Sequence, residues 1–384
     1  MKLMKIALFT DGIWPYVIGG MQKHSYFLCR YFARNKINIL LIHTSARISE
    51  DIIELSCFSE EEKKYIHAVW VAKPKVKSFP GHYIYQSWLY SREIYHKLGG
   101  FPDVDFIIAK GMTGWYFLTK KGRTTPRIGI NIHGYEFMQK KANFKMYLES
   151  LLLRFPLTWV NRNADYVFSY GGKITGLIRN LGVPQDKIIE APSAIEPEWM
   201  NDTNTSVHNP LQFVFIGRYE RRKGIEEINR VAGDLFSKGY DFKFSFVGPI
   251  PSDKQLSFPK AQYYGKVVDK NILQKILTDA DILVCPSYAE GMPNVIFEGM
   301  ANGCAVIATD VGAVSILVND KNGWLIPPAN IEGLRQAMEQ AIKSSSTEIR
   351  EKKIAAYNHI AKHFIWEDVS KKLLHSIKTR VDNQ

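Results

Sequence analysis

The chain has 384 residues, of which 46% are hydrophobic, which is enough to fill more than one core and predicts two globular domains. Its net charge of +12 at pH 7 is uneven, with a balance of +10 over residues 1–200 and +2 over residues 201–384. No nucleic-acid-binding motif accompanies this charge, and no run of about eighteen apolar residues predicts a membrane span.

The basic first half also carries many aromatic residues, concentrated in residues 65–97. Basic and aromatic side chains together favour contact with an anionic membrane surface. The cysteines show no CxxC spacing and are interpreted as thiols of a reducing compartment; they are Cys29, Cys57, Cys285 and Cys304. We therefore expect a cytoplasmic protein that can reach the inner face of the membrane, with no nucleic-acid partner.

The first predicted strand covers residues 5–9, and its apolar run, interrupted by Lys5 and Asp11, is too short for a signal peptide. A loop containing Gly19 and Gly20 follows, and then a helical pattern. The loop lacks GxGxxG, so it does not indicate a dinucleotide site, and two glycines serve a tight turn equally well.

Six further strands are predicted in the first half, mostly separated by helical patterns. This alternation predicts an α/β fold in which helices cover both faces of a parallel sheet. The expected strands are residues 37–42, 67–72, 104–109, 127–132, 165–169 and 187–190.

Polar residues at the strand ends are candidate functional groups. The sequence HGYE places His133 just beyond a strand's carboxyl end, where ligands of open α/β sheets collect. Two D-x-D pairs, Asp103/Asp105 and Asp279/Asp281, stand at strand entrances, where aspartate commonly serves a turn or a cap. No metal site is predicted from them.

Residues 144–160 form an apolar helical stretch that fits either a membrane-surface helix or a core helix. Pro156 interrupts a continuous amphipathic pattern, which favours the core helix. Residues 201–210 then have the composition of a linker.

The second half begins with a strand, LQFVFIG, followed by Arg218 and then by Lys223-Gly224 at the start of a helix. Between these cations, Arg221 and Arg222 are expected to face solvent. Residues 330–380 are expected to be mostly helical.

The most informative stretch is 281–312, where the buried strand Ile282–Cys285 leads through a Gly/Pro loop to a helix that begins near Pro293. The free N–H groups of a helix N-terminus suit phosphates or sugar hydroxyls. Glu290 in the loop and Glu298 in the helix offer carboxylates suited to vicinal hydroxyls. A second buried strand, residues 305–308, completes a βαβ unit.

This stretch, PSYAEGMPNVIFEGMANGCAVIATDVGA with its E-x7-E spacing, closely resembles the donor-site signature of retaining GT-B glycosyltransferases, specifically glycosyltransferase family four. GRYERRKG matches the family's G-R-x4-K-G, which binds the donor diphosphate. Two positions depart from the family pattern: Ser193-Ala194 replaces Asn-Gly, and Gly248-Pro249 replaces the start of Gly-x-Gly. No donor role is carried onto Ser193 or Ala194.

The resemblance implies a GT-B fold of two Rossmann-like, doubly wound domains facing a cleft. The first domain, residues 1–200, would bind the acceptor, and the second, residues 201–365, would bind the nucleotide sugar. Residues 366–384 would form a helix that crosses back to the first domain.

The resemblance also implies the activity: retaining transfer of a hexose from a UDP-, GDP- or ADP-sugar to a glycan, lipid-linked or other hydroxyl acceptor in bacterial surface polysaccharide assembly. No cofactor and no essential metal are expected. The implied catalytic residues are Arg218, Lys223, His133 and Glu290. The implied donor-binding residues are Gly19, Gly20, Gly217, Val267, Gly291, Met292, Pro293, Asn294 and Glu298.

Other functions of the same architecture remain open at this stage. A nucleotide-sugar epimerase would need no acceptor, and an α-glucan phosphorylase-like enzyme would need a lysine-bound pyridoxal phosphate. A non-catalytic sugar-nucleotide-binding protein would have no need of the full charge set. The pairing of Arg218 and Lys223 with Glu290 and Glu298 favours a transferase.

Overall fold

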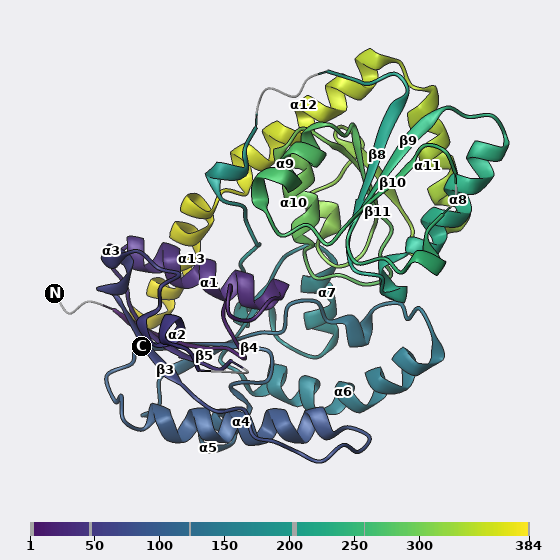
Figure 1. The fold of residues 1–384 in the computed structure, drawn as a ribbon. Coiled ribbons are helices and arrows are strands. Elements are labelled where there is room, and N and C mark those ends of the chain that lie inside the picture. Colours follow the sequence, from purple (N-terminus) through teal and green to yellow (C-terminus); the bar gives the residue numbers. More distant parts are fainter. Residues whose placement is uncertain (1–3, 46–47, 123, 202–205, 257, 383–384) are drawn as a thin grey trace. The chain divides into compact units, whose positions relative to one another are not determined.

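The computed structural model describes residues 4–45, 48–122, 124–201, 206–256 and 258–382. Part of the expected linker, residues 202–205, lies outside these ranges. The chain packs into two units (Figure 1). The first comprises residues up to 133, 148–193 and the chain from 366 onward; the second comprises 134–147 and 194–365. Residues 134–147 thus pack with the second unit, although they fall within the range expected for the first domain.

The first unit is built on a seven-stranded sheet in the order β3-β2-β1-β4-β5-β6-β7, and its strands pair in parallel. All seven strands expected from the sequence are confirmed, with ends shifted by up to two residues. The strands are β1 Lys5–Phe9, β2 Asn38–His43, β3 Ile66–Trp70, β4 Phe106–Lys110, β5 Arg127–Asn131, β6 Tyr166–Ser169 and β7 Ile188–Glu190.

Helices cover both faces of this sheet, with α1, α3 and α13 on one face and α4 and α5 on the other (Figure 1). The helices are α1 Gly20–Arg34, α2 Glu50–Glu54, α3 Glu60–Lys63, α4 His82–Leu98, α5 Trp115–Lys120, α6 Phe144–Asn163, α7 Lys173–Asn180 and α13 Trp366–Asp382. The last of these is the C-terminal helix that the sequence predicts to return to the first domain. Its Trp366 is buried and stacks on Tyr31 of α1, with 5.8 Å between ring centroids.

The second unit repeats the architecture with a six-stranded parallel sheet in the order β10-β9-β8-β11-β12-β13. Its helices α9, α10 and α12 lie on one face and α8 and α11 on the other (Figure 1). The strands are β8 Leu211–Ile216, β9 Phe242–Val247, β10 Ala261–Gly265, β11 Ile282–Cys285, β12 Ala305–Thr309 and β13 Gly323–Ile326. The helices are α8 Ile225–Ser237, α9 Lys270–Thr278, α10 Asn294–Ala301, α11 Ile331–Lys343 and α12 Ser346–His363.

In both sheets the strand order reverses beside the first strand, β1 in one and β8 in the other. At such a switch point the connections leave in opposite directions, so the carboxyl ends of the two central strands open a crevice for ligands. The switch points lie between β1 and β4 in the first unit and between β8 and β11 in the second.

Helix α6 departs from the predicted core helix. It continues through Pro156, and its second half buries Pro156, Leu157 and Val160. Between Phe144 and Phe155 it instead exposes six large apolar side chains: Phe144 (72% exposed), Tyr147 (49%), Leu148 (47%), Leu151 (46%), Leu152 (48%) and Phe155 (79%). The core-helix prediction is therefore wrong for residues 144–155. Along the described chain, no helix is long and apolar enough to cross a bilayer.

Candidate active site

Most of the predicted site residues of the second unit lie in two loops at its switch point. One loop follows β8 and contains Arg218 and Lys223, and the other follows β11 and contains Glu290. The loops are joined by a hydrogen bond of 2.7 Å from the N–H of Tyr288 to the carbonyl of Arg222.

Gly224 allows the close approach of these two loops. Its φ of 72° is in the left-handed region, and a Cβ at this position would lie 2.4 Å from the carbonyl oxygen of Pro286. Any side chain would therefore clash with the backbone of the facing loop. The Lys-Gly pair of the sequence motif thus places a cation beside a residue that must be small.

Lys223 and Glu290 form the central ion pair of the site. The Nζ of Lys223 lies 2.6 Å from Oε1 of Glu290, and Arg222 reaches the same oxygen at 3.6 Å. Burial alone would raise the pKa of Glu290, but Lys223 and Arg222 outweigh it and hold that pKa below its ordinary value of 4.5. The Glu290 carboxylate is therefore ionised at neutral pH.

Arg218 occupies a different environment at the edge of the site. Its side chain is 72% exposed, and its guanidinium pairs with Glu220 at 2.8 Å. Glu220 also accepts from Arg222 at 2.9 Å, so one carboxylate links two of the loop's arginines. The sequence analysis did not identify Glu220, which stands between the motif's fixed positions.

Arg221 was predicted to face solvent, and this prediction is wrong. Its guanidinium donates to both carboxylate oxygens of Glu227, at 2.9 and 2.7 Å, and lies 4.9 Å from the ring of Tyr288. The hydroxyl of Tyr288 donates to the same Glu227 at 2.6 Å. Arg221 therefore connects the loop after β8 to the loop after β11. Arg222 is also largely covered, with 25% of its side chain exposed.

Hydrogen bonds to its backbone also fix the loop that contains Glu290. The amide of Gln139 donates to the carbonyl of Glu290 at 2.6 Å and accepts from its N–H at 3.4 Å. On another side, Gly312 approaches so closely that a Cβ would lie 2.2 Å from the Glu290 carbonyl, and Ala313 donates to Gly291 at 2.8 Å. Together with the loop after β8, these two segments fix the conformation of the loop that contains Glu290.

Helix α10 begins at Asn294, with Pro293 at its N-cap, one residue later than predicted. Met292, Pro293 and Glu298 are buried, while Gly291 and Asn294 are half-buried. Gly217 directly follows β8, and its N–H donates to the carbonyl of Val247 at 2.9 Å. Val267 follows β10, which β9 separates from β8, so the topology places it farther from the loop of Glu290 than the other donor-site candidates of the second unit.

The remaining predicted residues belong to the first unit. Gly19 and Gly20 begin α1, after the loop that follows β1. His133 follows β5 with a φ of 64°, and the hydroxyl of Tyr170 contacts its Nδ1. Burial and then Lys110 lower the pKa of His133 well below its ordinary 6.5, so its imidazole is neutral at pH 7.

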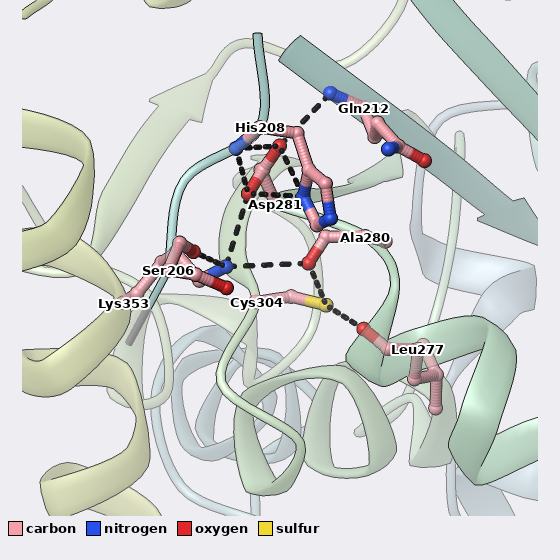
Figure 2. A network of polar contacts seen from close by, with 8 residues as sticks. All are labelled: Ser206, His208, Gln212, Leu277, Ala280, Asp281, Cys304 and Lys353. Carbon is pink, nitrogen blue, oxygen red and sulfur yellow. Dashed lines mark hydrogen bonds and ion pairs between the residues drawn. The ribbon is translucent and has the colours of Figure 1, made fainter. Parts of the chain in front are cut away.

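Three of the four aspartates of the D-x-D pairs have structural partners. Asp103 and Asp105 accept from the side chain and the backbone N–H of Lys5, each at 2.8 Å. Asp281 is fully buried and accepts from Lys353 at 3.0 Å (Figure 2). Within the ranges that the structure describes, no cluster of three potential metal ligands is present.

Comparison with known proteins agrees with the resemblance to glycosyltransferases that the sequence motifs indicate. Residues 210–344 match the family described as Glycosyl transferases group 1, which confirms the resemblance drawn from the motifs. TuaC of Bacillus subtilis, named as a teichuronic acid biosynthesis glycosyltransferase, is 36% identical over 125 residues, which are 33% of this chain and 31% of TuaC. The chain spans between about a third and about half of the length of the first curated relatives that it matches.

Solved structures match nearly the whole chain. Sucrose-phosphate synthase from Thermosynechococcus elongatus has a TM-score of 0.80 and 15% identity, covering 99% of this chain and 100% of its own. Anabaena HepE in complex with UDP-glucose has a TM-score of 0.67 and 13% identity, covering 98% and 100%. At these identities the likeness shows the fold alone, and the predicted GT-B fold is confirmed.

Proposed function

We propose that this chain, which carries the group 1 glycosyltransferase domain over residues 210–344, moves a sugar from a nucleotide-sugar donor to a hydroxyl acceptor in bacterial surface polysaccharide assembly. The observation that carries the proposal is the ion pair between Lys223 and the buried Glu290 in the loops that follow β8 and β11. A cation and a carboxylate at a switch point suit a ligand that has both phosphates and hydroxyls.

In the proposed reaction, the bond between the sugar and the diphosphate breaks, and negative charge grows on the leaving diphosphate. Lys223 and Arg218 stabilise that charge, a role that otherwise needs a metal ion. The transferred sugar keeps its anomeric configuration. Of the two glutamates, Glu290 lies nearer to this sugar than Glu298 does. Glu298 binds the ribose hydroxyls of the nucleotide. The acceptor, a glycan or a lipid-linked sugar, binds to the first unit.

The function is tested by a turnover screen of the purified full chain with UDP-, GDP- and ADP-sugars, followed by identification of the glycosylated product. A UDP-sugar is the first choice, because the structurally similar HepE was solved with UDP-glucose. Each active donor is assayed with and without EDTA, and most activity is expected to survive chelation. Nucleotide-sugar binding without transfer to any acceptor would favour a binding protein, and rearrangement of the donor would favour an epimerase.

The two glutamates are expected to differ in what they affect. Glu298→Gln should weaken binding of the sugar nucleotide and of the free nucleotide by a similar factor, because both contain the ribose. Glu290→Gln should lower transfer more than it lowers affinity for the free nucleotide, because a contact with the reacting sugar matters most in the transition state. Calorimetry gives the affinities and initial rates give transfer.

Glu290 is also the partner of Lys223, at 2.6 Å, so its replacement leaves that lysine free to bind the diphosphate. Affinity of Glu290→Gln for free nucleotide is therefore expected to be unchanged or increased. If Glu290→Gln instead weakens free nucleotide as much as Glu298→Gln does, with transfer otherwise intact, this division of roles is wrong.

We also propose that the first unit contacts an anionic membrane surface through the outward face of α6. Leu148, Leu151, Leu152 and Phe155 have the i, i+3, i+4, i+7 spacing of one helical face, opposite the buried Leu157. Nearby α4, whose Tyr83 interacts with Glu149, also binds the preceding loop, in which Lys73, Lys75 and Lys77 are exposed.

Replacing both Leu151 and Phe155 with serine is expected to reduce binding to vesicles containing phosphatidylglycerol by about tenfold or more, because the bound state then buries less apolar surface. Co-sedimentation measures this binding. Ile354→Ser, at an exposed aliphatic residue of α12, is the matched control. Equal binding of the wild type to uncharged vesicles would contradict the role of the lysines.

A further inference from the structure

A polar cavity of about 270 Å³ lies on one face of the second unit's sheet. Its described lining includes no residue of the loops after β8 and β11, so the cavity is distinct from the candidate active site. Strands β8, β9 and β10 form its floor, and the end of α9 forms one wall. The floor contains Gln212, Lys243, Ser245, Gln262 and Tyr264, and the wall contains Asp279.

The sequence of β9 explains why the cavity is polar. In this strand, FKFSFV, the three phenylalanines pack into the core that α8 and α11 share, and Lys243 and Ser245 face the opposite side. Strands of a parallel sheet are ordinarily buried on both faces and lack this alternation. Because apolar and polar residues alternate here, the α9 face of β9 is suited to water or to a polar ligand.

Strand β10 forms the edge of the sheet and brings an aromatic ring to the cavity. Its pairing with β9 skips Tyr264, because Tyr263 and Gly265 pair with consecutive residues of β9. Such a bulge re-aims a side chain, and bulges are frequent at sheet edges and next to active sites. Tyr264 lines the cavity and is 38% exposed, so its ring is accessible to a ligand.

The polar side chains of the cavity have free hydrogen-bonding groups. Within the described chain, the side chains of Gln212, Ser245 and Gln262 have no hydrogen-bond partner. Lys243 and Asp279 form no ion pair with any described residue, and Asp279 is the one aspartate of the D-x-D pairs whose carboxylate has no described partner. Pairing in register places Gln262 beside Ser245, on strands about 5 Å apart. One small ligand can therefore reach several of these groups.

His208 lies at the side of the cavity where the chain enters β8. Its Nδ1 lies 3.2 Å from the carboxylate of Asp281 (Figure 2). Because a carboxylate only accepts hydrogen bonds, Nδ1 carries the hydrogen of the neutral ring, and Nε2 is left as an acceptor. No described residue is a hydrogen-bond partner of Nε2. The cavity therefore combines acceptors with the donors of Lys243 and of the two glutamines.

This set of groups suits a sugar better than other small ligands. Sites for drug-sized molecules have volumes of about 300–1,000 Å³ and are mostly apolar, whereas this cavity is smaller and mostly polar. A nucleotide would need a glycine-rich loop or a helix N-terminus for its phosphates, and the described lining supplies neither. Amides, a carboxylate and an imidazole bind neighbouring hydroxyls, and an aromatic ring packs on the C–H groups of a sugar ring.

We propose that this cavity binds one sugar unit of a saccharide chain, at a site separate from the proposed donor site. Asp279 and the two glutamines bind hydroxyls of the sugar, Lys243 donates to a hydroxyl or to a carboxylate, and the ring of Tyr264 packs on an apolar face. Binding at this site does not depend on transfer. Only its benefit rests on the proposed function, because a chain held here stays at high local concentration near the enzyme that extends it.

Ligand-observed NMR titration of the full chain tests the proposal with two probes, maltotetraose, which is neutral, and tetragalacturonate, which is acidic. At least one probe is expected to bind at millimolar concentrations, and the comparison tells whether Lys243 donates to a hydroxyl or to a carboxylate. Lys243→Ala should weaken this binding about tenfold, the effect of one charge-assisted hydrogen bond, and Gln262→Ala several-fold. Lys243→Arg keeps the charge and should retain most of the affinity. Both residues are exposed, so the variants are expected to fold.

Two further variants are controls. Lys238→Ala removes the same charge at the end of α8, on the other face of the sheet, and should leave saccharide binding unchanged. Lys223→Ala, in the proposed donor site, should leave it unchanged too. Failure of both probes to bind would overturn the proposal, and so would wild-type affinity in Lys243→Ala and Gln262→Ala, or loss of binding in Lys223→Ala. These titrations do not measure turnover, so failure of the proposed function is recognised separately in the donor screen.

Discussion

Lys223→Ala is expected to lower turnover by about a hundredfold or more, the scale observed when one preorganised charge stabiliser is removed from an active site. Lys223 ends the loop after β8, and its side chain is 19% exposed, so the charge is already held in a partly dry site. Arg218→Ala should have an effect of the same order, although its 72% exposed side chain must become ordered when the donor binds.

The lysine variant also leaves the buried carboxylate of Glu290 with Arg222 as its nearest described cation, at 3.6 Å. Comparison of the double replacement, Lys223→Ala with Glu290→Gln, against Glu290→Gln alone separates this effect from the loss of the diphosphate contact, because neither of these variants has an unpaired buried carboxylate at residue 290. Steady-state rates with the identified donor give the result, and Lys254→Ala, at an exposed lysine of the same unit, is the control. Turnover like that of the wild type in both single variants would refute the assignment.

The second large effect concerns stability. Lys353→Met is expected to reduce the free energy of unfolding by about 3–5 kcal/mol, because it leaves the buried charge of Asp281 without its cation. Both side chains are 0% exposed, and 3.0 Å separates their charged atoms (Figure 2). Lys353 also donates to the carbonyl of Ser206 at 2.7 Å, so the pair ties α12 to the chain that enters β8.

Asp281 has further donors, the backbone N–H groups of His208 and Gln212, at 3.3 and 3.0 Å. The combined replacement of Asp281 by Leu and Lys353 by Met should therefore cost less than the sum of the two single changes, since neither charge remains buried. Chemical denaturation measures the stability. Lys362→Met, exposed in the same helix, should change it by less than about 0.5 kcal/mol. A similarly small loss for Lys353→Met would show that the pair does not hold these segments together.

The sequence predicted the strands well because strand signals are local. Apolar runs of four to six residues bounded by glycine, proline or polar residues define β1 and β11, and parallel strands buried on both faces lack any competing pattern. The unit β11–α10–β12 was predicted almost residue by residue, because Pro293 and the two glutamates mark where strand, loop and helix meet.

Side-chain partners were harder to predict, because they depend on residues far apart in the chain. No neighbour of Gln139 in the sequence indicates that its side chain donates a hydrogen bond to the backbone of Glu290, which is 151 residues later. Arg221 resembles its neighbour Arg222 in sequence, yet it turns inward to Glu227 and Tyr288. Lys110 resembles any lysine at the end of a strand until the tertiary structure shows it fully buried.

The packing of residues 134–147 with the second unit has a consequence for domain exchange. A chimaera joined at residue 200 would combine a foreign Gln139 segment with the native loop of Glu290, and would also separate α13 from the α1 with which it packs. A recombinant that keeps each unit's own contacts must be joined at four junctions, near residues 133, 147, 193 and 365. The two structural units are therefore not encoded as two separate halves of the gene.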